Sequence, residues 1–247
     1  MPMRLKVNAA AFAAAALALT PAIAAAAAPA FAEPRAAAPG ELPSVMASAP
    51  SDSLKELRRA RTAMLSTDEA PYAGIIPWRQ PRPDRVQDVS DPWDEVTHPC
   101  RDATYAALGG EAFRNRILVS ETATTYDMAV EQDVLLFPDA ATAATAYEQL
   151  TVELTTCQER LAESGADLDV THVGDITDPT GGQGTVWNVD FPTSEPEFLE
   201  DMTAAIAQRG RAVTVISISR YGTLASYDPA ATLPTAQAAL ARLAYVE

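Results

Sequence analysis

The feature of this sequence that most constrains its fold is a single pair of cysteines, Cys100 and Cys157. Cys157 lies in a run of apolar residues spaced alternately by four and three positions, which is the buried stripe of an amphipathic helix. The members of this stripe are Ala143, Tyr147, Leu150, Leu154, Cys157 and Leu161. Asp139, directly after Pro138, is placed to cap the helix at its N-terminus. We therefore expect Cys157 to point into the core.

Cys100 follows Pro99, and proline is favoured at the first position of a helix, so a second helix is predicted from here to about residues 108–109. A disulfide would join the two helices, and closing such a long loop would contribute about 4 kcal/mol in the chain-entropy treatment. The alternative is a metal or redox site on His98 and Cys100. It lacks a second ligand pair and a C-x-x-C motif. We expect a structural inter-helix disulfide.

The N-terminal residues place the chain outside the cytoplasm, where a cysteine pair is normally oxidised. Arg4 and Lys6 form a basic region, an uncharged stretch rich in alanine follows, and residues 30–32 (AFA) put small side chains where a signal peptidase reads them. We predict that residues 1–32 are a Sec-type signal peptide cleaved after Ala32, and that the protein is secreted. The alternative is an uncleaved membrane anchor, since the uncharged run is long enough to span, although two prolines interrupt it.

The chain is strongly acidic, with 33 acids against 18 bases and a net charge of −15. A field of this sign repels phosphate backbones and anionic lipid headgroups, so nucleic-acid partners and a membrane-surface role are disfavoured. After signal cleavage we expect no stable membrane insertion. Excess acid would favour a cationic or metal-bridged ligand, although secreted proteins also use negative charge for solubility.

Proline-rich stretches divide the rest of the chain. Residues 33–51 are rich in alanine, proline and serine, and are predicted to be a flexible leader. Residues 52–247 are predicted to form one domain, which begins with a short helix through Leu54, Leu57 and Met64. Within it, residues 71–99 contain too many prolines for a helix or a central strand, and are predicted to be an irregular segment over the core.

Alternating apolar residues identify the strands. The predicted strands are residues 114–121, 126–137, 167–173, 185–191 and 211–219. Residues 203–208 can either pair with the last strand across a tight turn or form a helix. A closing helix starts at Pro234, with Leu240, Leu243 and Ala244 expected inward. This order of elements predicts an α+β fold, a largely antiparallel β-sheet covered on one face by helices.

Motifs for catalysis are absent from the sequence: it contains no G-x-S-x-G, H-E-x-x-H, P-loop, dinucleotide fingerprint or EF-hand loop. His98 and His172 are expected to be structural or surface residues. Asp127, Glu131 and Asp133 share one strand face, where they form either a carboxylate pair for glycoside hydrolysis or a solvated surface. We predict no catalytic residues, no metal site and no cofactor.

Two groups of residues resemble a known family. One is the strand end 134–138 (VLLFP), followed by Asp139 and an alanine-rich helix that contains Cys157; the other is a strand with Trp187 and a later hairpin turning at residues 209–210. Together they resemble the extracytoplasmic sensor-like domain of mycobacterial PknH-type Ser/Thr kinases, which also occurs alone in actinobacterial lipoproteins and secreted proteins. The resemblance implies an antiparallel sheet with helices around a ligand-binding cleft. Members typically carry two disulfides, whereas this chain can form one.

A sheet covered by helices on one face leaves the other face or a cleft free for a ligand. The side chains near the predicted strand ends that could line it are Tyr221, Tyr227, Arg220 and Asp190. We interpret the protein as a non-enzymatic ligand-binding or sensor-like domain of the actinobacterial cell envelope. Its partner would be an unknown small molecule or a cell-envelope component. The alternatives are a secreted hydrolase with dispersed carboxylates, and an envelope protein-interaction module that makes contact through residues 71–99, with Trp78 or Trp93 exposed.

Overall fold

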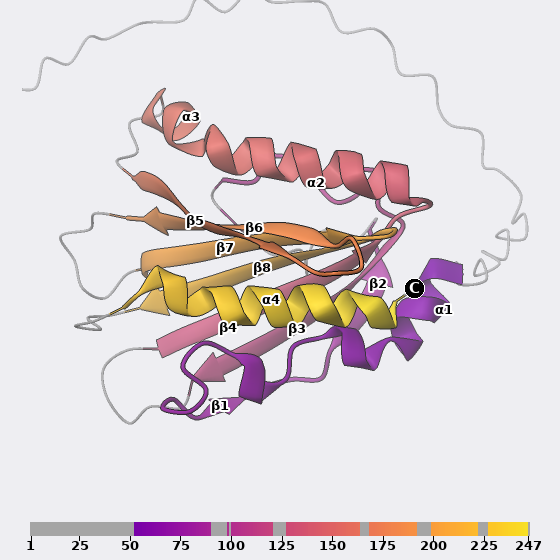
Figure 1. Ribbon diagram of the computed structural model, residues 1–247, viewed down its shortest axis with the longest axis horizontal. Helices are drawn as coiled ribbons and strands as arrows, with labels where there is room; N and C mark the ends of the chain where they lie inside the picture. The colour runs from indigo at the N-terminus through magenta and orange to yellow at the C-terminus, as the bar shows by residue number, and fades with distance from the viewer. Residues whose placement is uncertain are drawn as a thin grey trace, which may run out of the picture. The chain divides into compact units, whose positions relative to one another are not determined.

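An antiparallel sheet of eight strands forms the centre of the protein, shown in Figure 1. This computed structural model describes residues 52–89, 98, 100–120, 127–163, 168–191, 199–221 and 227–246. The strands are β1 (Trp78–Arg79), β2 (Arg85–Asp88), β3 (Ala112–Ser120), β4 (Asp127–Leu136), β5 (Asp169–Thr177), β6 (Gln183–Asp190), β7 (Leu199–Arg209) and β8 (Ala212–Tyr221). The predicted signal peptide and leader lie outside the described residues.

The strand order is β1-β3-β4-β8-β7-β6-β5, with β2 also paired to β3. Every pairing is antiparallel, as predicted. The proline-rich segment is less irregular than expected, because β1 and β2 within it pair with β3 at the edge of the sheet, where proline is tolerated. The ambiguous residues 203–208 belong to strand β7, and the turn to β8 is made at Gly210, which has a φ of 51°.

Helices precede, interrupt and close the sheet. They are α1 (Asp52–Arg59), α2 (Ala140–Thr155), α3 (Cys157–Glu163) and α4 (Leu233–Arg242), with short 3-10 helices η1 (Arg61–Ala63), η2 (Thr67–Glu69), η4 (Pro229–Thr232) and η5 (Leu243–Tyr245). Asp139 caps α2 as predicted, because its carboxylate accepts a 2.7 Å hydrogen bond from the backbone N–H of Thr142. The helix predicted to continue through Leu161 is divided at Thr156 into α2 and α3.

Helices cover both faces of the sheet, not one as predicted (Figure 1). The face under α1 and α4 buries Met128, Val130, Ala205, Ala207, Ile216 and Ile218. The face under α2 buries Leu135, Ala204, Ile206, Val213 and Val215. The central strands are therefore apolar or small on both sides, and such strands must be covered twice. In the closing helical segment Leu240 and Leu243 are buried as expected, whereas Ala244 is exposed.

A buried ion cluster fastens the N-terminal segment to β3. The Asp84 carboxylate contacts the guanidinium groups of Arg114 and Arg116, each at 2.6 Å, and the Asp84 side chain is only 5% exposed. The two arginines also donate to the backbone carbonyls of Leu57 and Leu65, at 2.7 and 2.6 Å. Segments with little regular structure of their own are thus held against the sheet by charge-assisted hydrogen bonds.

Candidate functional site

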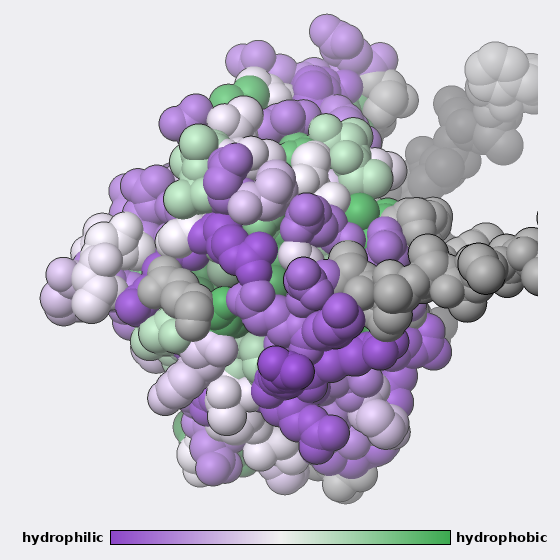
Figure 2. All heavy atoms as spheres, turned by 90° about the vertical axis from the view of Figure 1, so that its right-hand side faces the viewer, coloured by the Kyte–Doolittle hydropathy of each residue, from purple (hydrophilic) through white to green (hydrophobic). Residues whose placement is uncertain are grey.

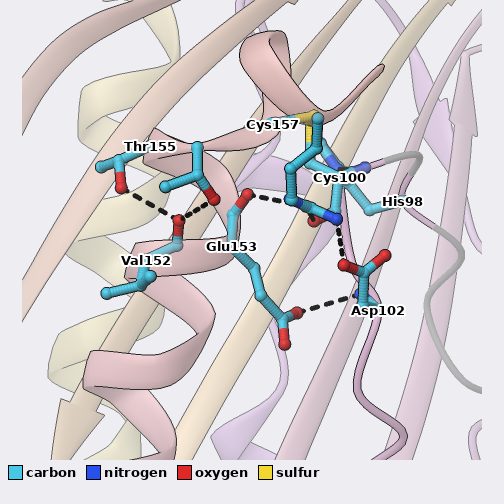
Figure 3. The surroundings of a disulfide bond; sticks show 9 residues. His98, Cys100, Asp102, Val152, Glu153, Thr155 and Cys157 are labelled. Carbon is cyan, nitrogen blue, oxygen red and sulfur yellow. Dashed lines mark hydrogen bonds and ion pairs between the residues drawn. A yellow bond between two sulfur atoms is a disulfide. The ribbon is translucent and has the colours of Figure 1, made fainter. Parts of the chain in front are cut away.

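The disulfide between Cys100 and Cys157 is present, as predicted, with a Cα–Cα distance of 5.1 Å (Figure 3). Both cysteines are fully buried. Cys157 is the first residue of α3, but Cys100 lies in a segment of turns and not in the helix expected there. The bond therefore joins a helix to a loop, and the inter-helix part of the expectation is wrong.

Side chains of α2 and α3 explain why the Cys100 segment is not helical. Arg160 donates to the carbonyls of Cys100 and Glu153, at 2.8 and 3.0 Å, and forms an ion pair with Asp102. The Glu153 carboxylate accepts the backbone N–H of Asp102 at 3.1 Å (Figure 3) and that of Ala103 at 3.3 Å. These side chains hydrogen-bond the backbone N–H and C=O groups that would otherwise be paired within a helical turn.

His98 sits beside the disulfide as a buried, neutral imidazole. Burial, together with the smaller effect of the positive charge of Arg101, lowers the pKa of His98 to about 4. Its Nδ1 accepts the backbone N–H of Cys100 at 3.0 Å. The adjoining apolar hollow is only about 20 Å³ in volume, which has room for one water and not for a larger ligand. Within the described ranges no cluster of three histidines, cysteines, aspartates or glutamates is arranged to hold a metal ion.

This burial predicts a loss of stability in mild acid. The folded pKa of about 4 lies below the ordinary 6.5, so the contribution of His98 is complete above pH 6.5 and is lost as the pH falls toward 4. The loss reaches about 3 kcal/mol. Urea unfolding at pH 7, 5 and 4 should show this acid-dependent loss of unfolding free energy in the wild type and not in His98→Gln. His172→Gln, at a half-exposed histidine, controls for removing an imidazole as such, and equal pH dependence in wild type and His98→Gln would contradict the prediction.

Three of the four residues predicted to bind a ligand converge at one end of the sheet. The Arg220 guanidinium lies over the Tyr227 ring, 5.2 Å from its centroid, and forms an ion pair with Asp201. The Tyr227 hydroxyl is 2.5 Å from the Thr203 hydroxyl, and burial raises the pKa of Tyr227 to about 12. Asp190 lies directly opposite Asp201 on the neighbouring strand. The side chain of the fourth residue, Tyr221, lies outside the described part of the chain.

Aspartates stand side by side across three adjacent strands here. The register pairs Asp169 with Asp190, Asp190 with Asp201, and Asp201 with Arg220. Partial burial raises the pKa of Asp190, and the charge of Asp201 and a hydrogen bond to it raise the pKa further. Like charges opposite one another are unfavourable, so the row is held together at the expense of stability. Sequence reasoning missed Asp169 and Asp201 because strand register was needed to find them.

Tyr72 completes this end of the site. Its backbone φ is positive, at 56°, a conformation that residues other than glycine rarely adopt. Its ring centroid is 6.5 Å from that of Tyr227, and its hydroxyl accepts the backbone N–H of Asp228 at 3.0 Å. A bulky residue in this backbone region costs energy and often marks a functional position. No signal in the sequence identified it.

Of the three carboxylates singled out on β4, Asp133 belongs to the core, whereas Glu131 is only partly buried. Asp133 is fully buried and accepts hydrogen bonds from Tyr105 at 2.7 Å and Asn115 at 2.8 Å, so the solvated-face interpretation is wrong for this residue. The Asn115 amide also donates to Glu131 at 3.1 Å. The side chain of Asp127 lies outside the described residues. Internal donors thus occupy the Asp133 carboxylate, and we assign it a structural role.

The remaining candidates are structural or lie at the surface. His172 Nε2 is 3.0 Å from the Asp175 carboxylate, and its ring lies tilted against the partly buried Trp187, with 4.7 Å between the ring centroids. Residues 178–182 form a turn, because the Asp178 carboxylate accepts the backbone N–H of Gly182 at 3.2 Å. Trp78 is half-buried and donates to a backbone carbonyl at 2.9 Å, and Trp93 lies outside the described residues.

Comparisons with known proteins identify the family. The chain matches the model of the PknH-like extracellular domain over residues 94–217. The extracellular domain of PknH from Mycobacterium tuberculosis, known from a crystal structure, is 16% identical; the alignment covers 74% of this chain and 94% of that one, with a TM-score of 0.41. No curated protein matches the chain. No helix in the described ranges is long and apolar enough to cross a membrane. Because the family model matches half of its length, the chain belongs to the family of PknH-like extracellular domains.

Proposed function

We propose that this extracellular domain is secreted after cleavage following Ala32 and binds a small polar ligand of the actinobacterial cell envelope without catalysing a reaction. The proposed site is the Asp190, Asp201, Arg220 and Tyr227 cluster. The observation that carries the proposal is the row of aspartates Asp169, Asp190 and Asp201 on adjacent strands, in which Asp201 pairs with Arg220.

The chemistry of this cluster favours a ligand that donates hydrogen bonds or carries a positive charge. Arg220 forms its ion pair with Asp201 and lies over the Tyr227 ring. Asp190 is exposed to solvent and lies beside the negative charge of Asp201. A cationic or donor group placed against Asp190 would relieve that repulsion. The aromatic ring of Tyr227 would supply the apolar contact that small-molecule sites combine with a few polar groups.

Native mass spectrometry of the protein from the culture supernatant of its own host, without reductant, tests the proposal. The intact mass should correspond to cleavage after Ala32 and to the loss of two hydrogens at the disulfide. A small molecule retained through purification should appear as a second, heavier species. An empty protein of the expected mass would contradict ligand binding, and it would favour a protein-partner role.

The variant Asp190→Asn links a retained molecule to this cluster. It keeps the shape of the side chain but removes its charge, so we expect the heavier species to fall at least tenfold. Asp175→Asn is the matched control, since Asp175 is an exposed aspartate on the neighbouring strand β5. Equal retention by both variants would place the molecule elsewhere.

A further inference from the structure

A groove lies between the N- and C-terminal helical segments, at the other end of the sheet from the aspartate row. It consists of two adjoining hollows of about 500 and 420 Å³, which share Thr62 and Tyr245. The other lining residues are Glu56, Arg59, Ala60, Arg211 and Val246 in the first, and Glu69, Ala238, Ala241 and Arg242 in the second. Each hollow has the volume of a small-ligand site. Except for Arg211, the lining residues lie outside the segment matched by the family model.

Two ion pairs form opposite parts of the groove. Arg211 pairs with Glu56, and Arg242 contacts both carboxylate oxygens of Glu69 at 2.9 and 2.7 Å. Arg242 also donates to the backbone carbonyl of Thr62 at 2.6 Å, which fixes its guanidinium in place. All four charged side chains remain 22–35% exposed. The groove therefore offers positioned hydrogen-bond donors and acceptors, the combination that sugar hydroxyls need because each can both donate and accept.

Arg59 adds an uncompensated positive charge. It is exposed, and within the described part of the chain neither it nor Arg58 has an ion-pair partner. Residues 52–89 carry seven bases against six acids, in a chain whose net charge is −15. Figure 2 faces this end of the molecule and shows strongly hydrophilic residues gathered on it. The lining of the groove itself has three arginines and two glutamates, so it carries a net positive charge on an acidic protein and is suited to an anionic group.

Tyr245 stands between the two hollows with 61% of its surface exposed, unlike most large apolar side chains of the described residues. An exposed aromatic ring flanked by fixed polar groups can pack against the C–H face of a sugar ring while the hydroxyls bond to its neighbours. A free arginine at one end would then bind a carboxylate or phosphate on the same sugar, which guanidinium groups do with paired hydrogen bonds.

We propose that this groove is a second binding site, which takes an anionic carbohydrate: a sugar ring that stacks on Tyr245 and places its carboxylate or phosphate on Arg59. It is separate from the aspartate cluster at the opposite end, which favours the reverse charge. The two sites would let one extracellular domain hold a charged envelope polysaccharide and a different small molecule at the same time.

Calorimetric titration of the secreted chain with three probes tests the site. The probes are an oligogalacturonate, a phosphorylated mannan oligosaccharide and uncharged maltohexaose. At least one charged probe should bind tenfold or more tightly than maltohexaose, and the preferred probe distinguishes a carboxylate from a phosphate as the source of charge. Binding of neither charged probe, or equal binding of all three, overturns the proposal.

Paired variants separate a built site from general charge attraction. Arg59→Ala should raise the Kd about tenfold, the equivalent of one charge-assisted hydrogen bond, whereas Arg58→Ala on the same helix should change it less than twofold. Tyr245→Ala should also weaken binding about tenfold, and Tyr245→Phe should not. Equal effects of the two arginine variants, or none for Tyr245→Ala, overturn the site. Asp190→Asn should leave this binding unchanged, so the two proposed sites can fail independently.

Discussion

Replacing Asp84 with asparagine should lower the free energy of unfolding by about 3–5 kcal/mol. The Asp84 carboxylate is the shared partner of Arg114 and Arg116, whose side chains are only 6% and 15% exposed. The isosteric amide would leave two buried guanidinium groups without their counter-charge, and removing one partner of a buried pair is far more damaging than its net contribution suggests. Equilibrium unfolding in urea at pH 7 measures the loss.

Asp68→Asn is the matched control, because Asp68 is an exposed aspartate in the same N-terminal segment. A loss below about 1 kcal/mol in Asp84→Asn would show that the cluster behaves as a surface ion pair.

The pH dependence of stability supplies a second check. Burial alone would raise the pKa of Asp84, but hydrogen bonds from Arg116 and Arg114 and their charges hold it below the ordinary 3.8. The stability difference between wild type and variant should therefore be complete above pH 3.8 and shrink as the pH falls below it.

Much of the sheet was predictable because its strands alternate in sequence. The alternation in residues 126–137 predicted strand β4, and the cap at Asp139 located the start of α2. The second covering layer was not predictable, because β7 is rich in alanine and β8 has serine and threonine among its valines and isoleucines. These small side chains are compatible with burial and with exposure alike. The same composition left β7 ambiguous between strand and helix.

Only part of the candidate site could be predicted from the sequence, because some of its contacts join residues that are far apart in the chain. Asp190, Arg220 and Tyr227 were found because they fall near predicted strand ends, but their partner Asp201 depends on register across β6, β7 and β8. Register follows from turn geometry and packing across the whole sheet. In the Cys100 segment, too, a distant residue overrides the local sequence signal. Its proline favours a helix locally, but Glu153, about fifty positions away, satisfies its backbone instead.

The groove is formed by contacts between residues that are even farther apart in the sequence. Arg242 reaches a carbonyl 180 positions earlier in the chain, and Arg211 pairs with Glu56 across 155. Neither terminal segment is basic enough or apolar enough in sequence to signal a site alone. Only the fold brings Arg59 and Tyr245 to one surface hollow.

The double variant Cys100→Ala/Cys157→Ala should lose about 4 kcal/mol of stability toward urea at pH 7, since the bond closes a loop of 57 residues. In the chain-entropy account the loss arises in the unfolded state, which becomes free to expand, so the dependence of unfolding free energy on urea should also steepen. Reductant should shift the wild type by the same amount and leave the double variant unchanged.

The native structure around the disulfide should survive this loss, because polar contacts hold the Cys100 segment independently of the sulfur atoms. Arg160 contacts the Cys100 carbonyl and Asp102, and Glu153 binds the neighbouring backbone N–H groups. We therefore expect near-native amide hydrogen exchange in residues 100–110 of the double variant when it is folded. If those amides lost their protection, the bond would be maintaining the native segment directly. The stability loss would then belong to the folded state and not to the entropy of the unfolded chain.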